Sequence, residues 1–424
     1  MGGRPNPPVV EEKKKLMTEV FERFVVSHHT GNNFVSALLN QLNDQNQLEK
    51  FFTTIGAGKG ANPWIASFFR EKRQYPIPDK LISREWVPEV ARLLSKGNQE
   101  KKRRKADLSY QALDNKVSRA LCKLTSKIFH AYEDGCSASF ARAKQQGVQC
   151  SYELPIAHWA TVRRLLIEEA GRYPEWEPTL ESTREPEEKL FRKEEELRLA
   201  DRITCPSQFV LDSIPLEIRQ KTPCQISPFG SPPCEHVDLD HSSKSDSLKL
   251  LFVGSMSQRK GLADLFEAMK LLKREPISLS ILGQPSMPME FYRKQFSKFE
   301  YFPPCTNQRV REIMKAHDAL VLPSIVEGRA LVQQEALSCG LPIIVTPNAG
   351  GTDLVDEGKT GHLVPIRSPE KIAEAISMLK RKSAEKNEIQ KWCQTKASFY
   401  TWSNYAQKIV DFNLSLPPQI LDIA

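Results

Sequence analysis

The sequence predicts an α/β protein with two domains, each built around a parallel sheet. At 424 residues the chain is long enough for two domains of roughly 200 residues each. The clearest pattern lies between Asp318 and Pro365, where a buried strand, a loop, a helix and a second buried strand follow one another. The order of strand, loop and helix also begins at Phe21 and at Leu248, so both halves of the chain contain it.

Composition and charge narrow the class of protein. The chain has 40% hydrophobic and 26% charged residues, and its net charge of +8 suits a phosphorylated ligand or an anionic surface without requiring either. Its nine cysteines include no C-x-x-C pair, which favours reduced thiols over a disulfide framework. No apolar run reaches the length of a membrane span, and the start, M-G-G-R-P-N-P-P, has no signal-peptide core. We therefore expect a cytoplasmic protein, and peripheral attachment to the cytoplasmic face of a membrane stays open.

The chain is expected to begin with a disordered segment and to continue with a strand and a helix. Residues 1–18 are polar and rich in proline and lysine, which predicts a disordered lead-in. Phe21 to Ser27 predicts a strand, and Phe34 to Leu42 predicts a helix. The turn between them contains Gly31 at the carboxyl end of the strand, so Gly31 is a candidate binding residue. Asn32 as an ordinary helix N-cap explains the same turn equally well.

Residues 62–115 are rich in aromatic residues, Arg and Pro, which predicts helices with breaks. The strongest basic run of the chain, K-K-R-R-K at Lys101–Lys105, lies within them. A solvated loop is the favoured interpretation of this run, and contact with anionic lipid or with a phosphorylated acceptor is the alternative. No aromatic residues alternate with the cations, so the run does not indicate nucleic-acid binding. A further helix is predicted from Leu113 to Ile128.

The rest of the first half is also predicted to alternate between helices and strands. A helix is expected from Ser137 to Gln146, and a strand from Val148 to Leu154. Residues 132–134 are candidates for contact with an acceptor, although a plain turn surface is the stronger interpretation. The highly charged residues 173–198 predict one exposed helix with many i,i+4 pairs. Ser207 is expected to cap the helix that follows it.

A Pro- and Ser-rich stretch, residues 227–247, predicts a linker between two domains. It contains a D-x-D pair, Asp238-Leu239-Asp240, but such a metal-binding pair should follow a buried strand rather than lie in a polar linker. Cys234-Glu235-His236 are consecutive and so lack the spacing of metal ligands. The sequence therefore predicts no metal site.

The second half opens with a pattern suited to a phosphate. The strand Leu248 to Val253 ends in Gly254, and a loop with the cations Arg259 and Lys260 precedes the helix Leu262 to Lys273. Backbone N–H groups at the start of a helix, together with cations, attract phosphate. The loop is neither a G-x-G-x-x-G turn nor a Walker motif, so a nicotinamide cofactor is disfavoured.

Two glutamates mark the next unit, with seven residues between them. Glu327 lies in the loop Ser324–Arg329, at the carboxyl end of one strand and the amino end of a helix, and Glu335 lies within that helix. A buried junction of strand and helix rarely needs two carboxylates for packing. A solvated helix end with one surface glutamate is an evenly matched alternative.

The stretch that begins at Glu327, E-G-R-A-L-V-Q-Q-E-A-L-S-C-G-L-P-I-I, resembles the E-x7-E signature of retaining glycosyltransferases of family 4. The match continues as far as Val364-Pro365, and it departs from the common form at Arg329 and Ala330. The segment G-S-M-S-Q-R-K-G resembles the G-R-x-x-x-x-K-G segment of the same family, with Ser255 where the arginine usually stands.

This resemblance implies the GT-B fold, two Rossmann-like domains that face each other across a cleft. We expect an N-terminal acceptor domain over residues 19–226 and a nucleotide-sugar domain over residues 248–396. Residues 397–424 would contain a helix that crosses back to the first domain, with Trp402 and Tyr405 packed at the crossing.

The resemblance also implies transfer of a sugar from a nucleotide diphosphate sugar to an acceptor hydroxyl, with retention. Lys260 and Arg259 would hold the diphosphate, Glu335 the ribose and Glu327 the donor sugar, while His158 would contact that sugar from the other domain. The residues expected to flank the donor are Gly254, Ser255, Arg329, Ala330 and Leu331.

Three of these assignments have alternatives. Arg259 either replaces the arginine missing at Ser255 or points to solvent. Arg329 either adds a cation near the phosphates or faces solvent, and His158 is alternatively a structural hydrogen-bonding side chain.

The expected donor is a UDP-, GDP- or ADP-sugar, with no metal and no further cofactor. The acceptor would be a glycan, a lipid-linked molecule or a small molecule, not a nucleic acid. A non-catalytic nucleotide-sugar scaffold is one alternative, which Ser255 favours and the Glu327–Glu335 pair opposes. An epimerase or phosphorylase on the same fold is the other.

Overall fold

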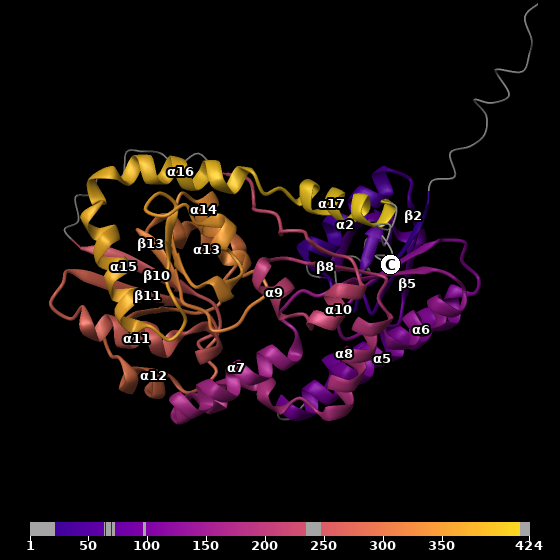
Figure 1. The fold of residues 1–424 in the computed structure, drawn as a ribbon, viewed down its shortest axis with the longest axis horizontal. Helices are drawn as coiled ribbons and strands as arrows, with labels where there is room; N and C mark the ends of the chain where they lie inside the picture. The colour runs from indigo at the N-terminus through magenta and orange to yellow at the C-terminus, as the bar shows by residue number, and fades with distance from the viewer. Residues whose placement is uncertain are drawn as a thin grey trace, which may run out of the picture.

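The computed structural model describes residues 22–415 apart from 63, 65–68, 70–72, 96–98 and 235–246. The predicted lead-in, residues 1–18, and the D-x-D pair of the linker lie outside the described residues. Figure 1 shows two lobes side by side, one formed by the first half of the chain and the other by the second half. Among the described residues, none of the helices is both long and apolar enough to cross a membrane.

The first lobe is built on a parallel seven-stranded sheet with the order β5-β2-β1-β6-β7-β8-β9. Its strands are β1 (Phe24–Ser27), β2 (Leu48–Thr53), β5 (Ile82–Arg84), β6 (Ile128–Tyr132), β7 (Gln149–Glu153), β8 (Arg202–Cys205) and β9 (Cys224–Ile226). A small two-stranded sheet pairs β3 (Ala57–Lys59) with β4 (Gln74–Pro78). The strand order reverses between β1 and β6, and ligands bind at such a switch point, beyond the carboxyl ends of the strands.

Helices cover both faces of this sheet. They are α2 (Asn33–Asp44), α4 (Trp86–Leu93), α5 (Gln99–Leu121), α6 (Ser137–Gln145), α7 (Trp159–Arg172), α8 (Glu187–Leu199), α9 (Gln208–Ser213) and α10 (Leu216–Lys221). One core cluster joins the sheet to α5, α6 and α8, and a second cluster on the other face joins it to α2. Ser207 caps α9 as predicted, its hydroxyl accepting from the N–H of Val210.

Three predictions for this lobe were wrong. The basic run at Lys101–Lys105 lies inside α5 rather than in a loop. The helix predicted from Leu113 to Ile128 ends at Leu121, because residues 128–132 form the buried strand β6, and periodicity alone does not separate a short apolar strand from a helix. Residues 173–198 are not one exposed helix: the short 3-10 helices η3 (Pro174–Thr179) and η4 (Glu181–Arg184) precede α8, since prolines interrupt helical hydrogen bonding.

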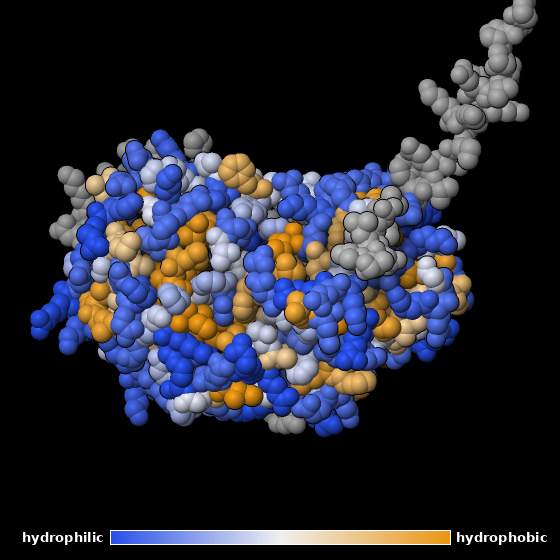
Figure 2. Space-filling model, viewed as in Figure 1, coloured by the Kyte–Doolittle hydropathy of each residue, from blue (hydrophilic) through white to orange (hydrophobic). Residues whose placement is uncertain are grey.

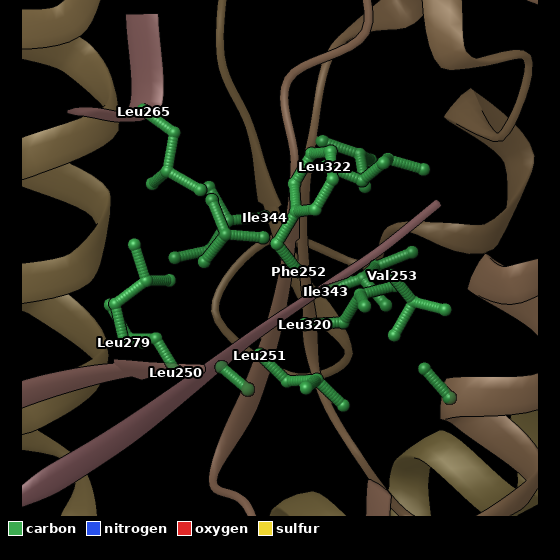
Figure 3. Close-up of a cluster of buried hydrophobic side chains, with 14 of the residues drawn as sticks. Leu250, Leu251, Phe252, Val253, Leu265, Leu279, Leu320, Leu322, Ile343 and Ile344 are labelled. Atoms are coloured by element: carbon green, nitrogen blue, oxygen red, sulfur yellow. The ribbon is translucent and has the colours of Figure 1, made fainter. Parts of the chain in front are cut away.

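The second lobe is built on a parallel six-stranded sheet with the order β12-β11-β10-β13-β14-β15. Its strands are β10 (Leu248–Val253), β11 (Ile277–Leu282), β12 (Glu300–Phe302), β13 (Ala319–Leu322), β14 (Ile343–Val345) and β15 (Gly361–Leu363). Its helices are α11 (Leu262–Leu271), α12 (Met289–Gln295), α13 (Asn307–Lys315), α14 (Leu331–Ser338), α15 (Pro369–Arg381) and α16 (Lys386–Ser398). The strands predicted for β10, β11 and β13 are confirmed, and their apolar side chains fill the core that Figure 3 shows. The switch point of this sheet lies between β10 and β13.

The last helix, α17 (Trp402–Leu414), leaves the second lobe and packs on α2 of the first (Figure 1). Tyr405 is buried there, and its hydroxyl donates to the carboxylate of Glu153 on β7 at 2.7 and 2.8 Å. Trp402 stacks on Phe229, with ring centroids 6.2 Å apart. Both aromatic side chains therefore pack at the crossing, as the sequence predicted for them.

A second segment crosses in the opposite direction. Trp176, in η3, is only 1% exposed and packs with Phe266 and Tyr292 in the core of the second lobe. Polar bonds reinforce this crossing, because Gln258 of the second lobe donates its side-chain N–H to Glu169 of α7 at 2.7 Å. The buried carboxylate of Glu169 also pairs with Arg367 at 2.5 Å. The lobes are thus fastened by two exchanged segments rather than by the linker alone.

We predict that Trp176→Ala lowers the free energy of unfolding by about 3–5 kcal/mol, because the substitution empties a site in a packed core. Trp86→Ala is the matched control: Trp86 is 57% exposed, so the change should stay within about 0.5 kcal/mol. Urea unfolding followed by circular dichroism measures both. Equal losses for the two variants would contradict the packing described for Trp176.

Candidate active site

Two loops meet at the switch point of the second sheet. One follows β10 and leads through the short 3-10 helix η5 (Gln258–Lys260), and the other follows β13 and leads to α14. The loops are joined by a backbone hydrogen bond from Ile325 N to Arg259 O, at 2.9 Å. This brings together residues that are far apart in sequence: the Nζ of Lys260 lies 2.6 Å from Oε1 of Glu327, and Nη1 of Arg259 lies 2.7 Å from the same oxygen.

The electrostatics of this group favour an anion. One carboxylate, that of Glu327, faces two cations, so the group keeps a net positive charge. Burial lowers the pKa of the Lys260 ammonium below its ordinary value, as does the neighbouring Arg259, while Glu327 acts in the opposite direction. A diphosphate placed here would neutralise the positive charge that the single carboxylate of Glu327 leaves unbalanced.

The structure contradicts the solvent alternative for Arg259, while its replacement of the arginine missing at Ser255 stays a prediction. Its guanidinium does not point to solvent: it lies beside Lys260, on the carboxylate of Glu327, with a second bond to the carbonyl of Val326 at 3.3 Å. Ser255 has no comparable reach, and its hydroxyl pairs with that of Ser257 at 3.3 Å. A cation is therefore present at the site although the usual position for one is a serine.

Gly254 meets a backbone requirement next to Lys260. Its φ of +148° is a conformation that side-chain-bearing residues rarely adopt. A Cβ at this position would also lie 3.4 Å from Cε of Lys260, on the aliphatic part of that side chain. The glycine thus lets the strand end turn closely around the lysine.

Of the two alternatives for Arg329, exposure to solvent is wrong. Its side chain is 0% exposed, so it does not face solvent. Its guanidinium is also committed elsewhere: it pairs with Asp353 at 2.7 Å and bonds Gln334 at 3.0 Å and the carbonyl of Gly350 at 3.1 Å, while Tyr400 stacks on it at 5.0 Å. Arg329 therefore fixes the loop after β14 to the start of α14, and its contact with a phosphate stays a prediction.

The remaining predicted donor residues lie on α14 or directly before it. Ala330 is the N-cap of α14, and its N–H donates to the carbonyl of Ala349 at 3.1 Å. Leu331 packs against the core of the first lobe. Glu335 lies one to two turns further along the helix and is half-buried. These positions agree with a donor site at the start of α14, and their roles stay predictions.

The first lobe touches this site directly. The carbonyl of Gly328, adjacent to Glu327, accepts from the hydroxyl of Ser207 at 2.6 Å. A Cβ on Gly328 would overlap the backbone carbonyl of Pro155, so only a glycine allows this approach. The space-filling view agrees, since the two lobes form one continuous surface on the face that it shows (Figure 2).

Both ring nitrogens of His158 have partners within the protein. It caps α7, accepting from the N–H of Ala160 at 3.4 Å, and its Nε2 lies 3.2 Å from the carboxylate of Glu194. Burial lowers the pKa of His158, while Glu194 opposes that shift. Between His158 and the group of Lys260 and Glu327, all of them described residues, no hydrogen bond or ion pair is formed. These contacts agree with the structural alternative.

The switch point of the first sheet contains two histidines, His28 and His29, that the sequence analysis did not single out, beside Tyr132, which it did. His28 and His29 follow β1, and their rings stack at 4.8 Å. His28 also meets Tyr132 at the end of β6, at 4.5 Å, and His29 stacks on Tyr110 of α5 at 3.6 Å. Burial and, to a smaller extent, the neighbouring Lys189 together lower the pKa of His29 to about 3, so the ring is neutral at physiological pH. Neutral imidazoles at this edge are suited to hydrogen bonds with hydroxyl groups.

Gly31 lies two residues beyond His29 at the same edge and is half-buried. It belongs to the first switch point, not to the group around Lys260. The signal that could have identified His28 and His29 is their position directly after a predicted strand. Within the described ranges, no group of three or more His, Cys, Asp or Glu is arranged to hold a metal ion.

Comparison with known proteins agrees with this geometry. Residues 247–381 match the family described as glycosyl transferases group 1. Both loops of the Lys260–Glu327 group lie inside this glycosyl transferases group 1 domain.

Curated relatives match over less than half of the chain. A D-inositol 3-phosphate glycosyltransferase of Pseudarthrobacter chlorophenolicus is 31% identical over 178 residues, 39% of this chain and 42% of the relative. A protein of the same name from Paenarthrobacter aurescens is 27% identical over 174 residues, 38% of this chain and 43% of the relative. The match thus spans less than half the length of these relatives.

Solved structures match nearly the whole chain. Sucrose-phosphate synthase from Thermosynechococcus elongatus aligns with a TM-score of 0.64 at 16% identity, covering 92% of this chain and 98% of that protein. Anabaena HepE in complex with UDP aligns with a TM-score of 0.62 at 13% identity, covering 93% and 100%. At such identities these matches establish the fold, and the fold is GT-B, with two Rossmann-like domains.

We predict that Gly328→Ala lowers the free energy of unfolding by about 1–3 kcal/mol, because the new methyl group meets a backbone carbonyl that no side-chain rotation can move. Gly171→Ala is the control. Gly171 lies in α7 with open space around it, so alanine there should stabilise by about 0.5–1 kcal/mol. Thermal unfolding distinguishes the two, and equal midpoints would contradict the close approach of the lobes at Gly328.

Proposed function

We propose that this protein is a retaining glycosyltransferase that transfers a sugar from a nucleotide diphosphate sugar to an acceptor hydroxyl. One observation carries the proposal: Lys260 and Arg259 converge on Glu327 at the switch point of a group 1 domain. Two buried or half-buried cations that share one carboxylate form a site with charge left over for a diphosphate.

In this proposal, donor binding is an exchange of partners. In the structure Glu327 neutralises part of the charge of Lys260 and Arg259. When the diphosphate takes over that role, the carboxylate of Glu327 becomes available to accept from hydroxyls of the donor sugar. Glu335, further along α14, would accept from the ribose hydroxyls.

The same cations explain the catalysis. As the bond between sugar and diphosphate breaks, negative charge develops on the leaving oxygens. Lys260, Arg259 and the amino end of α14 hold fixed positive charge there, so they stabilise the transition state more than the ground state. A base from the protein is not required, since the leaving phosphate can take the proton of the attacking hydroxyl on the same face.

UDP is the donor nucleotide that the comparisons favour among UDP, GDP and ADP. Anabaena HepE is described in complex with UDP, and a protein from E. coli with the same fold is described with UDP-2-fluoro glucose bound. The proposed acceptor is a glycan, a lipid-linked molecule or a small molecule that approaches the edge formed by His28, His29 and Tyr132. We propose action on the cytoplasmic side, without a metal or a further cofactor.

The scaffold alternative loses its main support in the structure. Its argument was the serine at position 255, and Arg259 supplies a cation at the site instead. His158 keeps its proposed sugar contact only if it leaves Glu194, so that role requires a rearrangement on donor binding.

Thermal stabilisation tests the donor site. UDP, GDP, ADP and their sugars are added to the wild type with and without EDTA, and a nucleotide at about 100 times its Kd should add about 2.7 kcal/mol. We expect one nucleotide to stabilise, EDTA to have no effect, and Lys260→Ala and Glu335→Ala to abolish the shift. Lys270→Ala, at an exposed ion pair in the same domain, is the control and should keep it. Lack of stabilisation by any nucleotide, or a full shift in Lys260→Ala, would contradict the site.

The lowered pKa of Lys260 predicts a pH dependence. The ammonium form binds the diphosphate, so affinity should fall as pH rises through the lowered pKa, before the ordinary lysine value of about 10.4 is reached. Lys260→Arg keeps its charge over this range, so its affinity, although weaker, should change little with pH. Titration calorimetry across alkaline pH measures both. A flat wild-type profile would show that Lys260 does not contribute its charge to binding.

A further inference from the structure

Helix α4 turns its apolar side chains outward. Trp86, Val87, Leu93 and Leu94 are all more than half exposed, with Trp86 at 57% and Leu94 at 76%. Their spacing of i, i+1, i+7 and i+8 places them on one side of the helix. A surface helix normally buries its apolar side, and an apolar cluster on one face is not the scattered exposure that needs no explanation.

A buried carboxylate holds α4 in this orientation. Glu89 is the only fully buried residue of the helix. It accepts from Arg73 at 2.8 Å, from Arg92 at 2.7 Å through two nitrogens, and from the hydroxyl of Ser109 on α5 at 3.1 Å. Rotating the helix to bury its apolar side would break these bonds, so the outward apolar face is part of the fold.

A basic surface adjoins this apolar face. The run Lys101–Lys105 forms an early part of α5, and its first four side chains are exposed. Lys105 donates to the carbonyl of Ala91 in α4 at 3.4 Å, which fixes the two helices side by side. Exposed Trp and Leu next to clustered Lys and Arg match a membrane interface, where apolar groups enter the acyl boundary and cations meet anionic headgroups.

We propose that α4 and the first turns of α5 form a docking surface for an anionic lipid membrane. The charge complementarity selects this partner. Three of the four exposed apolar side chains of α4 are aliphatic, whereas a nucleic-acid site would present several aromatic groups for base stacking.

Docking would orient the acceptor edge of the first lobe. Tyr110 lies five residues beyond Lys105 on α5, roughly 8 Å along the helix. Tyr110 stacks on His29 at the first switch point. If the proposed function holds, on which this step rests, the acceptor hydroxyl would be carried by a membrane lipid.

Vesicle cosedimentation tests the surface. The full chain is mixed with vesicles of phosphatidylcholine alone or of phosphatidylcholine with phosphatidylglycerol. We expect binding to the mixed vesicles only, weakened by salt. Trp86→Glu/Leu94→Glu and Lys102→Glu/Arg104→Glu should each lower the partition coefficient at least about tenfold.

Matched controls introduce the same number of glutamates at exposed apolar residues and at exposed lysines of the second lobe. Leu271→Glu/Phe399→Glu alters two exposed apolar residues, and Lys294→Glu/Lys298→Glu reverses two exposed lysines. Both should bind vesicles as the wild type does. Equal losses in the controls, or no binding of the wild type to either vesicle, would overturn the proposal. A dimer in sedimentation velocity that only the α4 variant abolishes, without vesicle binding, would assign the face to a second copy of this chain.

The nucleotide thermal shift is measured on the same samples. If a nucleotide shifts the unfolding temperature but the protein does not bind vesicles, the proposed docking surface is wrong and the donor site stands. If the protein binds vesicles but no nucleotide shifts its unfolding temperature, the proposed donor site is wrong and the docking surface stands.

Discussion

The carboxylate of Glu327 shared by Lys260 and Arg259 is the interaction on which the site depends. Two cations this close repel each other, and burial makes their charge costly, so a single carboxylate oxygen within 2.7 Å of both is what lets them remain together before a ligand arrives. The same arrangement leaves a deficit of negative charge. A diphosphate would remove that deficit, which is the physical reason for proposing that this group binds an anion.

The two crossing segments explain how this site is kept next to the first lobe. η3 places Trp176 in the core of the second lobe, and α17 places Tyr405 against the sheet of the first. Each crossing also contains buried polar bonds, to Glu169 in one case and Glu153 in the other. These two crossings therefore hold the lobes together in addition to the close approach of Gly328 to Pro155.

Some of the site followed from sequence because its signals are local. The strand ending at Gly254, the cations before α11 and the two glutamates around the start of α14 are each visible within a few residues, and they lie where a parallel sheet binds ligands. Arg329 shows the limit of that reasoning. Its neighbours in sequence suggested a phosphate contact, but its partners are Asp353 and Tyr400, which only the folded chain brings to it. His158 is a similar case, since Glu194 lies on a helix that was predicted to be wholly exposed.

The sequence by itself determined the class of fold and most strands of the second sheet, and it singled out Lys260, Arg259 and Glu327. These follow from periodicity, glycine turns and the spacing of motifs, which are properties of short stretches. Only the tertiary structure decided that Arg259 joins Lys260 on Glu327, that Trp176 belongs to the other lobe, and that α4 exposes its apolar side because Glu89 is bound beneath it. Each of these depends on pairing between residues far apart in the chain, where packing and the burial of charge overrule local preference.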